Sequence, residues 1–169
     1  WEEKSSMFKR DAVILVDTDS LTAKDLEKAL YTTDNPFTEL GIPESVHIIP
    51  VALPQLTTES LKDMGLDNKA MLKSRNMFAL GLVCWLFNRP VDKATAFLES
   101  KFQKKPQLIA PNVKVLTDGY NYGNNLALNI QTMNVEKSHD LPKGTYTSIA
   151  GNKATAWGLI AAAEKCGKR

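Results

Sequence analysis

The sequence predicts an α/β fold in which helices cover a layered sheet. Two short aliphatic runs, residues 12–16 and 46–51, have the β-branched composition of strands. Much of the remaining chain carries apolar residues at helical spacing. Residues 77–87 contain no charged or strongly polar side chain. Such a run predicts a helix buried on all sides at the centre of the core.

The composition is that of one globular domain. The chain has 169 residues, of which 43% are hydrophobic and 24% charged, enough to bury a core without metal or disulfide bonds. The net charge is +2 and basic residues are scattered among acids, so neither nucleic acid nor a membrane surface is a predicted partner. Cys84 and Cys166 form neither a disulfide framework nor a metal-binding spacing, which favours a reducing, cytoplasmic setting.

The first predicted strand, residues 12–16, is apolar on both faces, as in a parallel sheet covered by helices. Asp17 follows at its carboxyl end, a position that often binds ligands in α/β folds. Residues 17–20 also offer four side chains that can hydrogen-bond nearby backbone groups. We interpret Asp17 and Asp19 as residues of a solvated turn, with a ligand site as the alternative.

Residues 21–30 have an amphipathic helical pattern, and either Ser20 or Thr22 supplies its N-cap. The Gly and Pro residues between 32 and 44 predict a surface loop.

The second predicted strand is residues 46–51. Pro50 indicates an edge strand or a strand end. His47 is a lone histidine in this strand, and we expect a structural role for it rather than a catalytic one. A short helix over residues 57–64 then stops at Gly65.

The apolar helix over residues 77–87 is too short to cross a bilayer, which takes roughly 20 apolar residues. Asn68, Ser74 and Asn76 are all plausible N-caps for it. It ends near Asn88, because Pro90 disfavours helical geometry in the residue before it.

Pro90 opens the next predicted helix, which extends to residue 102 and forms an αα-hairpin with the apolar helix. A third helical pattern ends at Gly119 or Gly123.

The last part of the chain contains two more predicted strands, residues 126–132 and 145–149. Residues 134–144 read as a polar linker between them. A helix rich in Ala and Gly follows over residues 151–164, and we interpret it as the first helix of another domain. Because the chain starts at Trp1 and ends just after this helix, we expect both ends to be cut from a longer polypeptide.

No motif in the sequence makes an enzyme on its own. The Gly-Asn-Lys sequence at 151–153 lacks the spacing of phosphate-binding loops. Two isolated histidines cannot form a metal cluster, and there is no serine nucleophile elbow. We therefore assign no catalytic, cofactor-binding or metal-ligating residue.

Arg75 and Asn76 are the most distinctive polar residues, at the start of the apolar helix. Either Asn76 caps the helix and Arg75 forms a surface ion pair, or both face an anionic ligand or a partner. Tyr120 and Tyr122 either stack on a partner or pack at a helix end.

Several segments, in order and spacing, resemble the gamma domain of 2-oxoacid:ferredoxin oxidoreductases: 75–81, 88–91, 97–102, 105–106, Asn112 and 119–123. Residues 151–158 are similar to the opening of the pyrimidine-binding thiamine diphosphate domain, which follows gamma in the fused alpha subunit. The loop at 35–37 and the strand end at 50–51 resemble the 2-oxoglutarate type more than the pyruvate type.

The resemblance implies a domain organisation. Residues 1–133 would be a gamma domain without its Gly-rich N-terminal part, 134–144 a linker, and 145–169 the truncated start of the thiamine diphosphate domain. Gly151 and Asn152 then join Arg75, Asn76 and Tyr120 as candidate interface or ligand residues.

The resemblance also implies an activity. A 2-oxoacid, expected to be 2-oxoglutarate, reacts with coenzyme A to give acyl-CoA and CO2, and electrons pass to ferredoxin. Thiamine diphosphate, Mg²⁺ and an iron–sulfur cluster are implied for the whole enzyme but not for this chain, and the partners are the rest of the alpha subunit and a thiamine-binding beta subunit. The chain itself would have a structural role in packing between domains. The alternative is a non-catalytic interaction module with a gamma-like α/β fold.

Overall fold

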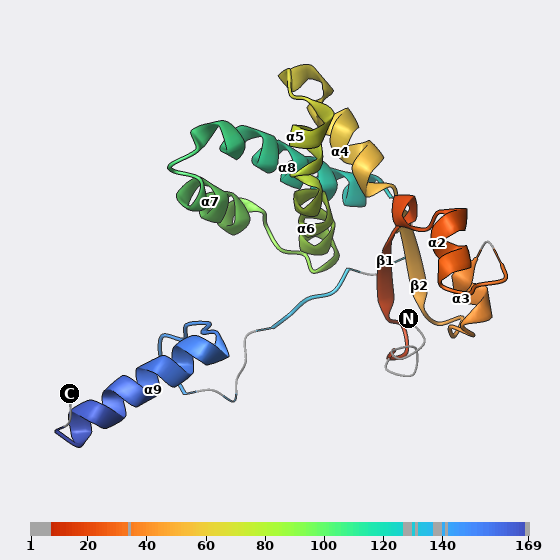
Figure 1. The fold of residues 1–169 in the computed structure, drawn as a ribbon. Coiled ribbons are helices and arrows are strands. Elements are labelled where there is room, and N and C mark those ends of the chain that lie inside the picture. The colour runs from red at the N-terminus through yellow and green to blue at the C-terminus, as the bar shows by residue number, and fades with distance from the viewer. Residues whose placement is uncertain are drawn as a thin grey trace. The chain divides into compact units, whose positions relative to one another are not determined.

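The computed structural model describes residues 8–33, 35–126, 130, 132–136, 140 and 142–167. The chain forms two compact units, Trp1–Val135 and Glu136–Arg169. The elements of the described residues are β1 (Val13–Asp17), η1 (Thr18–Ser20), α2 (Ala23–Lys28), α3 (Pro36–Glu39), β2 (His47–Val51), α4 (Leu53–Leu61), η2 (Lys62–Met64), α5 (Asn68–Leu72), α6 (Arg75–Leu86), α7 (Asp92–Lys101), η3 (Pro106–Leu108), α8 (Ile109–Asn125) and α9 (Gly151–Lys165), where η marks a 3-10 helix (Figure 1). The predicted α/β class is confirmed.

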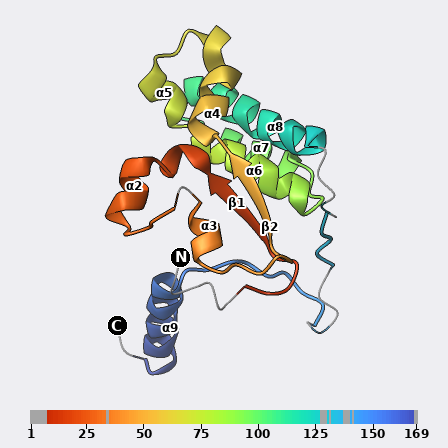
Figure 2. The ribbon, with the colours of Figure 1, turned by 90° about the vertical axis from the view of Figure 1, so that its right-hand side faces the viewer.

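The sheet of the first unit is a parallel pair, in which Val13 lies opposite His47 and Asp17 opposite Val51. Side chains alternate between two clusters, as the pleat of a strand requires. Ile14 and Val16 of β1 belong to one cluster, while Ile49 and Val51 of β2 belong to the other. Both faces of the pair are therefore covered, as the apolar sequence of the first strand predicts. Figure 2 shows the two strands side by side.

The helical part is built on the crossing of α6 and α8, which approach through glycines. A Cβ atom at Gly119 would lie 2.2 Å from the carbonyl oxygen of Phe78, and one at Gly81 would lie 2.2 Å from that of Leu116. The ring of Trp85 lies against Gly123 in the same way, 2.4 Å from a Cβ placed there. Only glycine fits at Gly81 and Gly119, because the two backbones touch there, whereas a side chain at Gly123 would meet the Trp85 ring.

These glycines correct one prediction. Neither Gly119 nor Gly123 ends the third helix, since α8 continues to Asn125. A glycine inside a helix is destabilising by roughly 1 kcal/mol relative to alanine, and here it allows a close approach that alanine would prevent.

The prediction that the apolar helix is buried on all sides is wrong. Phe78, Leu82 and Trp85 are buried, but Leu80 is 37% exposed and Val83 is 38% exposed. The strands, α4 and α8 cover the rest of α6, so one stripe remains open within this unit.

The start of α6 is at Arg75, with Ser74 in the N-cap position and no capping hydrogen bond from its side chain. Asn68 instead begins the separate helix α5, which the sequence analysis did not predict. The end at Leu86, close to Asn88, agrees with the prediction.

The N-terminal elements differ from the predictions in smaller ways. Thr22, not Ser20, caps α2 by accepting a hydrogen bond from the backbone N–H of Asp25. The predicted loop over 32–44 contains the short helix α3. The helix predicted over 57–64 begins earlier, at Leu53, because Pro54 is favourable in a first turn.

The C-terminal strands are not found among the described residues. Residues 145–149 are irregular, so that prediction is wrong. Within 126–132, Leu126, Ile130 and Thr132 are not in a strand, and the rest of that segment lies outside the described residues.

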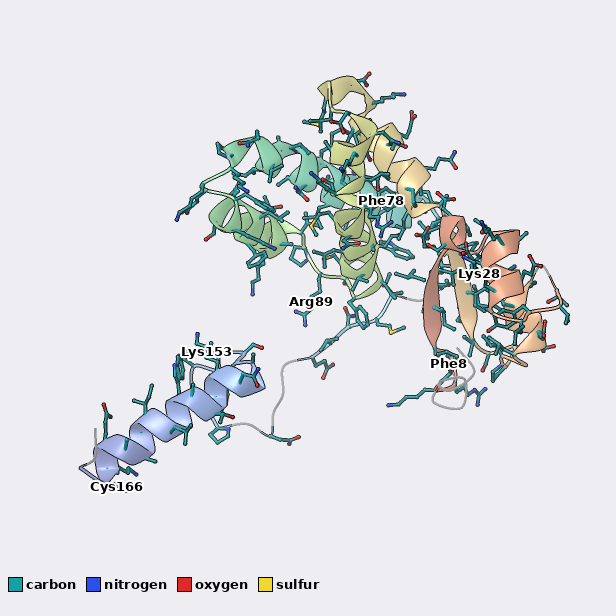
Figure 3. The ribbon with its side chains drawn as sticks, in the orientation of Figure 1. Phe8, Lys28, Phe78, Arg89, Lys153 and Cys166 are labelled. Atoms are coloured by element: carbon teal, nitrogen blue, oxygen red, sulfur yellow. The ribbon has the colours of Figure 1, made fainter. Side chains whose placement is uncertain are left out.

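The chain after α8 returns to the end of α6. The backbone N–H of Met133 donates to the Leu86 carbonyl at 2.7 Å. Arg89, labelled in Figure 3, donates from Nη2 to the Val135 carbonyl at 3.1 Å. The first part of the segment predicted as a linker is therefore anchored.

In the second unit, every residue of α9 is exposed except Ala163, which is half-buried. Its large apolar side chains include Trp157, which is 57% exposed, and Leu159, which is 68% exposed. Lys153 lies over the Trp157 ring, 4.8 Å from the centroid. Across the described part of the chain, no helix is both long and apolar enough to span a bilayer.

Candidate functional site

The residues that the sequence singled out belong to three helices. Arg75 and Asn76 lie in the exposed first turn of α6, whereas Tyr120 is half-buried in α8 and packs against the core. Gly151 and Asn152 open α9, in the other unit. The candidates therefore come from both units, three of them from the first.

The alternative roles can be compared with the observed contacts. Asn76 is not the N-cap of α6, and Arg75 takes part in none of the ion pairs found among the described residues. Tyr122 packs edge-on against Phe78, with ring centroids 5.6 Å apart. Both tyrosines are thus engaged in packing between helices.

Asp17 has the structural role in a turn that the sequence favours over a ligand site. Its carboxylate accepts hydrogen bonds from the backbone N–H of Asp19 and from the Ser20 hydroxyl, at 3.3 and 2.9 Å. It also accepts one from the backbone N–H of Leu53 at 3.3 Å. Asp17 therefore joins the end of β1 to the start of α4, which fixes where the helical part begins. His47 is exposed at the start of β2.

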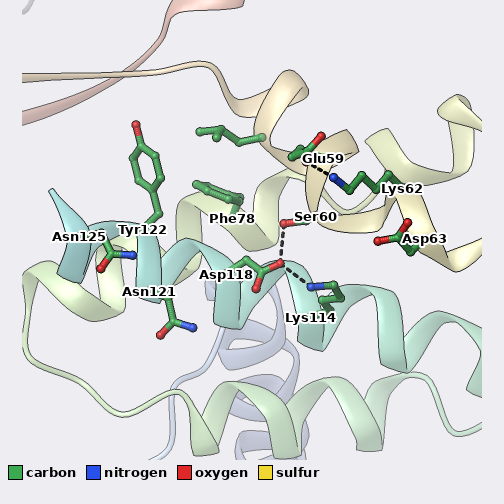
Figure 4. A pocket seen from close by; sticks show the side chains of 11 residues that line it. Glu59, Ser60, Lys62, Asp63, Phe78, Lys114, Asp118, Asn121, Tyr122 and Asn125 are labelled. Atoms are coloured by element: carbon green, nitrogen blue, oxygen red, sulfur yellow. Dashed lines mark hydrogen bonds and ion pairs between the residues drawn. The ribbon is translucent and has the colours of Figure 1, made fainter.

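A polar groove of about 400 Å³ lies between α4 and α8 (Figure 4). The Ser60 hydroxyl donates to Asp118 at 2.7 Å, and Lys114 forms an ion pair with the same carboxylate at 2.9 Å. Lys62 pairs with Glu59, whose hydrogen bond and charge raise the pKa of the lysine. Ser60, Lys114 and Asp118 therefore satisfy one another, as do Lys62 and Glu59, while Asp63 also lines the groove.

The groove could not be predicted from the sequence because its key partners are distant in the chain. Ser60 and Asp118 are 58 residues apart, and neither lies in a recognisable motif. Only the spacing of Lys114 and Asp118, four residues apart on one helix, is a signal that the sequence alone carries.

A second cavity, of about 250 Å³, lies among α6, α7 and α8. Asn76 contributes to its lining, together with Phe97 and Lys101 of α7. Asn112 of α8 also lines it and is only 8% exposed. This cavity, hereafter the α6–α7–α8 cavity, places Asn76, a candidate residue from the sequence, beside a hollow of the first unit.

The described residues offer no ligand set for a metal ion or an iron–sulfur cluster. Among the described residues, no group of three or more His, Cys, Asp or Glu side chains could hold a metal ion. Iron–sulfur clusters are held by sets of cysteine thiolates, and the chain has two cysteines in all. Burial raises the pKa of the Cys84 thiol, which makes it a poorer nucleophile.

Comparison with known proteins gives two matches. The family model described as pyruvate ferredoxin/flavodoxin oxidoreductase matches residues 1–122. The chain is 34% identical over 155 residues to the 2-oxoglutarate oxidoreductase subunit KorA of Mycobacterium tuberculosis (strain ATCC 25618 / H37Rv). That alignment covers 92% of this chain and 23% of the relative, so this chain spans less than a quarter of the relative's length. No solved structure matches.

Proposed function

The chain belongs to the pyruvate ferredoxin/flavodoxin oxidoreductase family, and we propose that it is part of the alpha subunit of an enzyme that oxidises 2-oxoglutarate. The observation that carries this proposal is the alignment with a 2-oxoglutarate oxidoreductase subunit over 92% of the chain. In the proposed reaction, 2-oxoglutarate loses CO2 and its acyl group is joined to coenzyme A. The electrons released pass to ferredoxin.

The proposed role of the first unit is structural. It corresponds to the gamma domain, residues 1–133, and its most closely packed feature is the crossing of α6 and α8 at Gly81 and Gly119. Such backbone contact makes the crossing rigid, because interiors at close packing yield little. A rigid unit of this kind can hold neighbouring domains in place without supplying a reacting group.

The cofactors belong elsewhere in the proposed enzyme. Thiamine diphosphate supplies the carbanion chemistry of decarboxylation when it is bound. We place it, with Mg²⁺ and the iron–sulfur cluster, on parts of the alpha subunit outside this chain and on the beta subunit, as the family resemblance implies. For the metals, the support is that no group of three or more His, Cys, Asp or Glu side chains among the described residues could hold an ion.

We further propose that residues 145–169 begin the pyrimidine-binding domain, after a linker at 134–144. The support is the character of α9, which carries apolar residues around its circumference and buries none of them within the described part of its unit. A helix that is apolar on all sides is stable only when other elements surround it. In the proposed enzyme these elements come from the rest of the alpha subunit.

The test is reconstitution of the full-length subunit with its beta partner. The complete mixture, given 2-oxoglutarate, coenzyme A and oxidised ferredoxin, should form succinyl-CoA and CO2 and reduce ferredoxin. Omitting either subunit or coenzyme A should abolish product formation. A full-length subunit that assembles with no such partner, and forms no acyl-CoA from any 2-oxoacid, would instead indicate the non-catalytic interaction module.

A further inference from the structure

The α6–α7–α8 cavity is small and partly enclosed by apolar side chains. Its volume of about 250 Å³ is below the roughly 300–1,000 Å³ of drug-sized sites, so it suits a smaller molecule. Met77, Leu80 and Leu98 contribute apolar walls. Phe97 also lines it and is 62% exposed, an uncommon environment for so large an apolar ring.

The charge of the lining is of one sign. The described lining residues include Lys73 and Lys101 but no Asp or Glu. The two acids of α7, Asp92 and Glu99, are not among them. Lys101 lies 5.6 Å from the ring centroids of both Phe97 and Phe102, so a cation is held beside two aromatic faces.

The start of α6 adds to this positive field. Asn76 and Met77 of its first turn line the cavity. The N-terminal end of a helix carries a partial positive charge and unpaired N–H groups. Ser74, in the N-cap position, makes no capping hydrogen bond with its side chain. The backbone N–H of Met77 donates to the Ser74 carbonyl at 2.8 Å, so an anion at this end would meet the earlier N–H groups of the turn without competing with a side-chain cap.

An independent observation is the state of Asn112. Its Nδ2 donates to the Leu108 carbonyl at 2.7 Å, and no described residue donates to its Oδ1. Every fully buried side-chain oxygen and nitrogen among the described residues has a hydrogen-bond partner. Because Oδ1 has none among those residues, this atom is accessible from outside the protein. Because Asn112 is 8% exposed and lines the cavity, we place Oδ1 at the cavity wall, where it can accept a hydrogen bond from a ligand.

We propose that the α6–α7–α8 cavity binds a small aromatic carboxylate that also carries a hydroxyl or N–H group. The carboxylate lies toward Lys73, Lys101 and the start of α6. The aromatic ring covers Phe97, and the hydroxyl or N–H donates to Asn112 Oδ1. This site does not depend on the reaction proposed above, because binding can be measured without turnover.

The test uses 4-hydroxyphenylacetate as the probe and calorimetric titration of the full-length subunit assembled with its partner. Tyramine, which has the same ring and hydroxyl but a positive head group, is the control ligand. We expect 4-hydroxyphenylacetate to bind and tyramine to bind at least about tenfold more weakly, since the site contributes charge-assisted hydrogen bonds to an anion.

Two sets of variants locate the site. Replacing both Lys73 and Lys101 by Gln should weaken binding by about tenfold or more. The matched control replaces Lys69 and Lys93 by Gln, which removes the same charge from α5 and α7 at exposed positions that do not line the cavity. Phe97→Ala should also weaken binding, and it is safe for folding because the ring is mostly exposed.

Three results would overturn the proposal. The first is equal affinity for tyramine and 4-hydroxyphenylacetate. The second is equal affinity of the Lys73/Lys101 and Lys69/Lys93 variants. The third is no measurable binding by the wild-type assembly, which would mean that polypeptide fills the cavity or that it stays empty.

Discussion

Replacing Gly119 by alanine should destabilise the first unit, because the added methyl group meets backbone. The new Cβ would lie 2.2 Å from the Phe78 carbonyl oxygen and 2.9 Å from the Phe78 Cα. Carbon–oxygen contacts of this kind normally span about 3.3–3.6 Å, so α6 and α8 would have to separate locally by about 1 Å. Neither side of the contact can move by a change of rotamer.

The size of the effect follows from two opposing terms. Overpacking a well-packed core typically costs about 1–3 kcal/mol, and a backbone contact places this change at the upper end. The higher helix propensity of alanine offsets about 1 kcal/mol. The net loss of unfolding free energy is about 2 kcal/mol, which for a chain of this size lowers Tm by about 4–8 °C.

The measurement is thermal unfolding of the 169-residue chain, followed by the near-ultraviolet circular dichroism of its aromatic residues. Gly158→Ala is the control, because nothing lies within 4 Å of a Cβ at that position in α9, and its Tm should stay at or above the wild-type value. A Gly119→Ala variant that unfolds at the wild-type temperature would show that the two helices do not touch there.

The same crossing predicts non-additive effects. Gly81→Ala should destabilise the unit in the same way, since its Cβ would lie 2.2 Å from the Leu116 carbonyl oxygen. Once one methyl group has separated the helices, the second meets less resistance. The double variant should therefore lose less stability than the sum of the two single variants.

Three further predictions concern single residues. Trp85→Ala should lower the unfolding free energy by about 3–5 kcal/mol, because Trp85 is buried in the core. The measurement is urea denaturation, and unchanged stability would show that this side chain is not part of the core. Asp17→Ala should lower it by about 1 kcal/mol, through loss of the cap and of the acceptor for the Leu53 N–H, with Asp19→Ala as the milder control. Because burial raises the pKa of Cys84, its alkylation by iodoacetamide should be slower than that of exposed Cys166 and should increase only at higher pH; equal rates across the pH range would contradict this.

The parts of the fold that depend on local pattern were predictable. The two strands, α7, α9 and the end of α6 all follow from short-range periodicity and from Pro90. The family resemblance, based on the polar residues that flank α6, is confirmed by the family match.

The missed features depend on contacts between distant segments. Gly119 reads as a helix end in isolation, and only the presence of Phe78 beside it explains a glycine inside α8. Likewise, the composition of α6 cannot reveal that Leu80 stays 37% exposed within its unit. The strand predicted over 145–149 failed because no neighbouring strand pairs with it in the described residues.

The candidate site shows the same limit. The sequence identified Asn76, but not its proximity to Lys101 and Asn112, which come from two other helices. Side chains that meet in a cavity from separate helices leave no spacing signal along the chain.

The most direct test of the central claim is substrate specificity of the complete enzyme. Rates of ferredoxin reduction should be measured under saturating coenzyme A, with 2-oxoglutarate, pyruvate and a branched-chain 2-oxoacid in parallel. We predict that kcat/KM is highest for 2-oxoglutarate. A higher value for pyruvate or the branched-chain substrate, or no reduction with any of the three, would contradict the account.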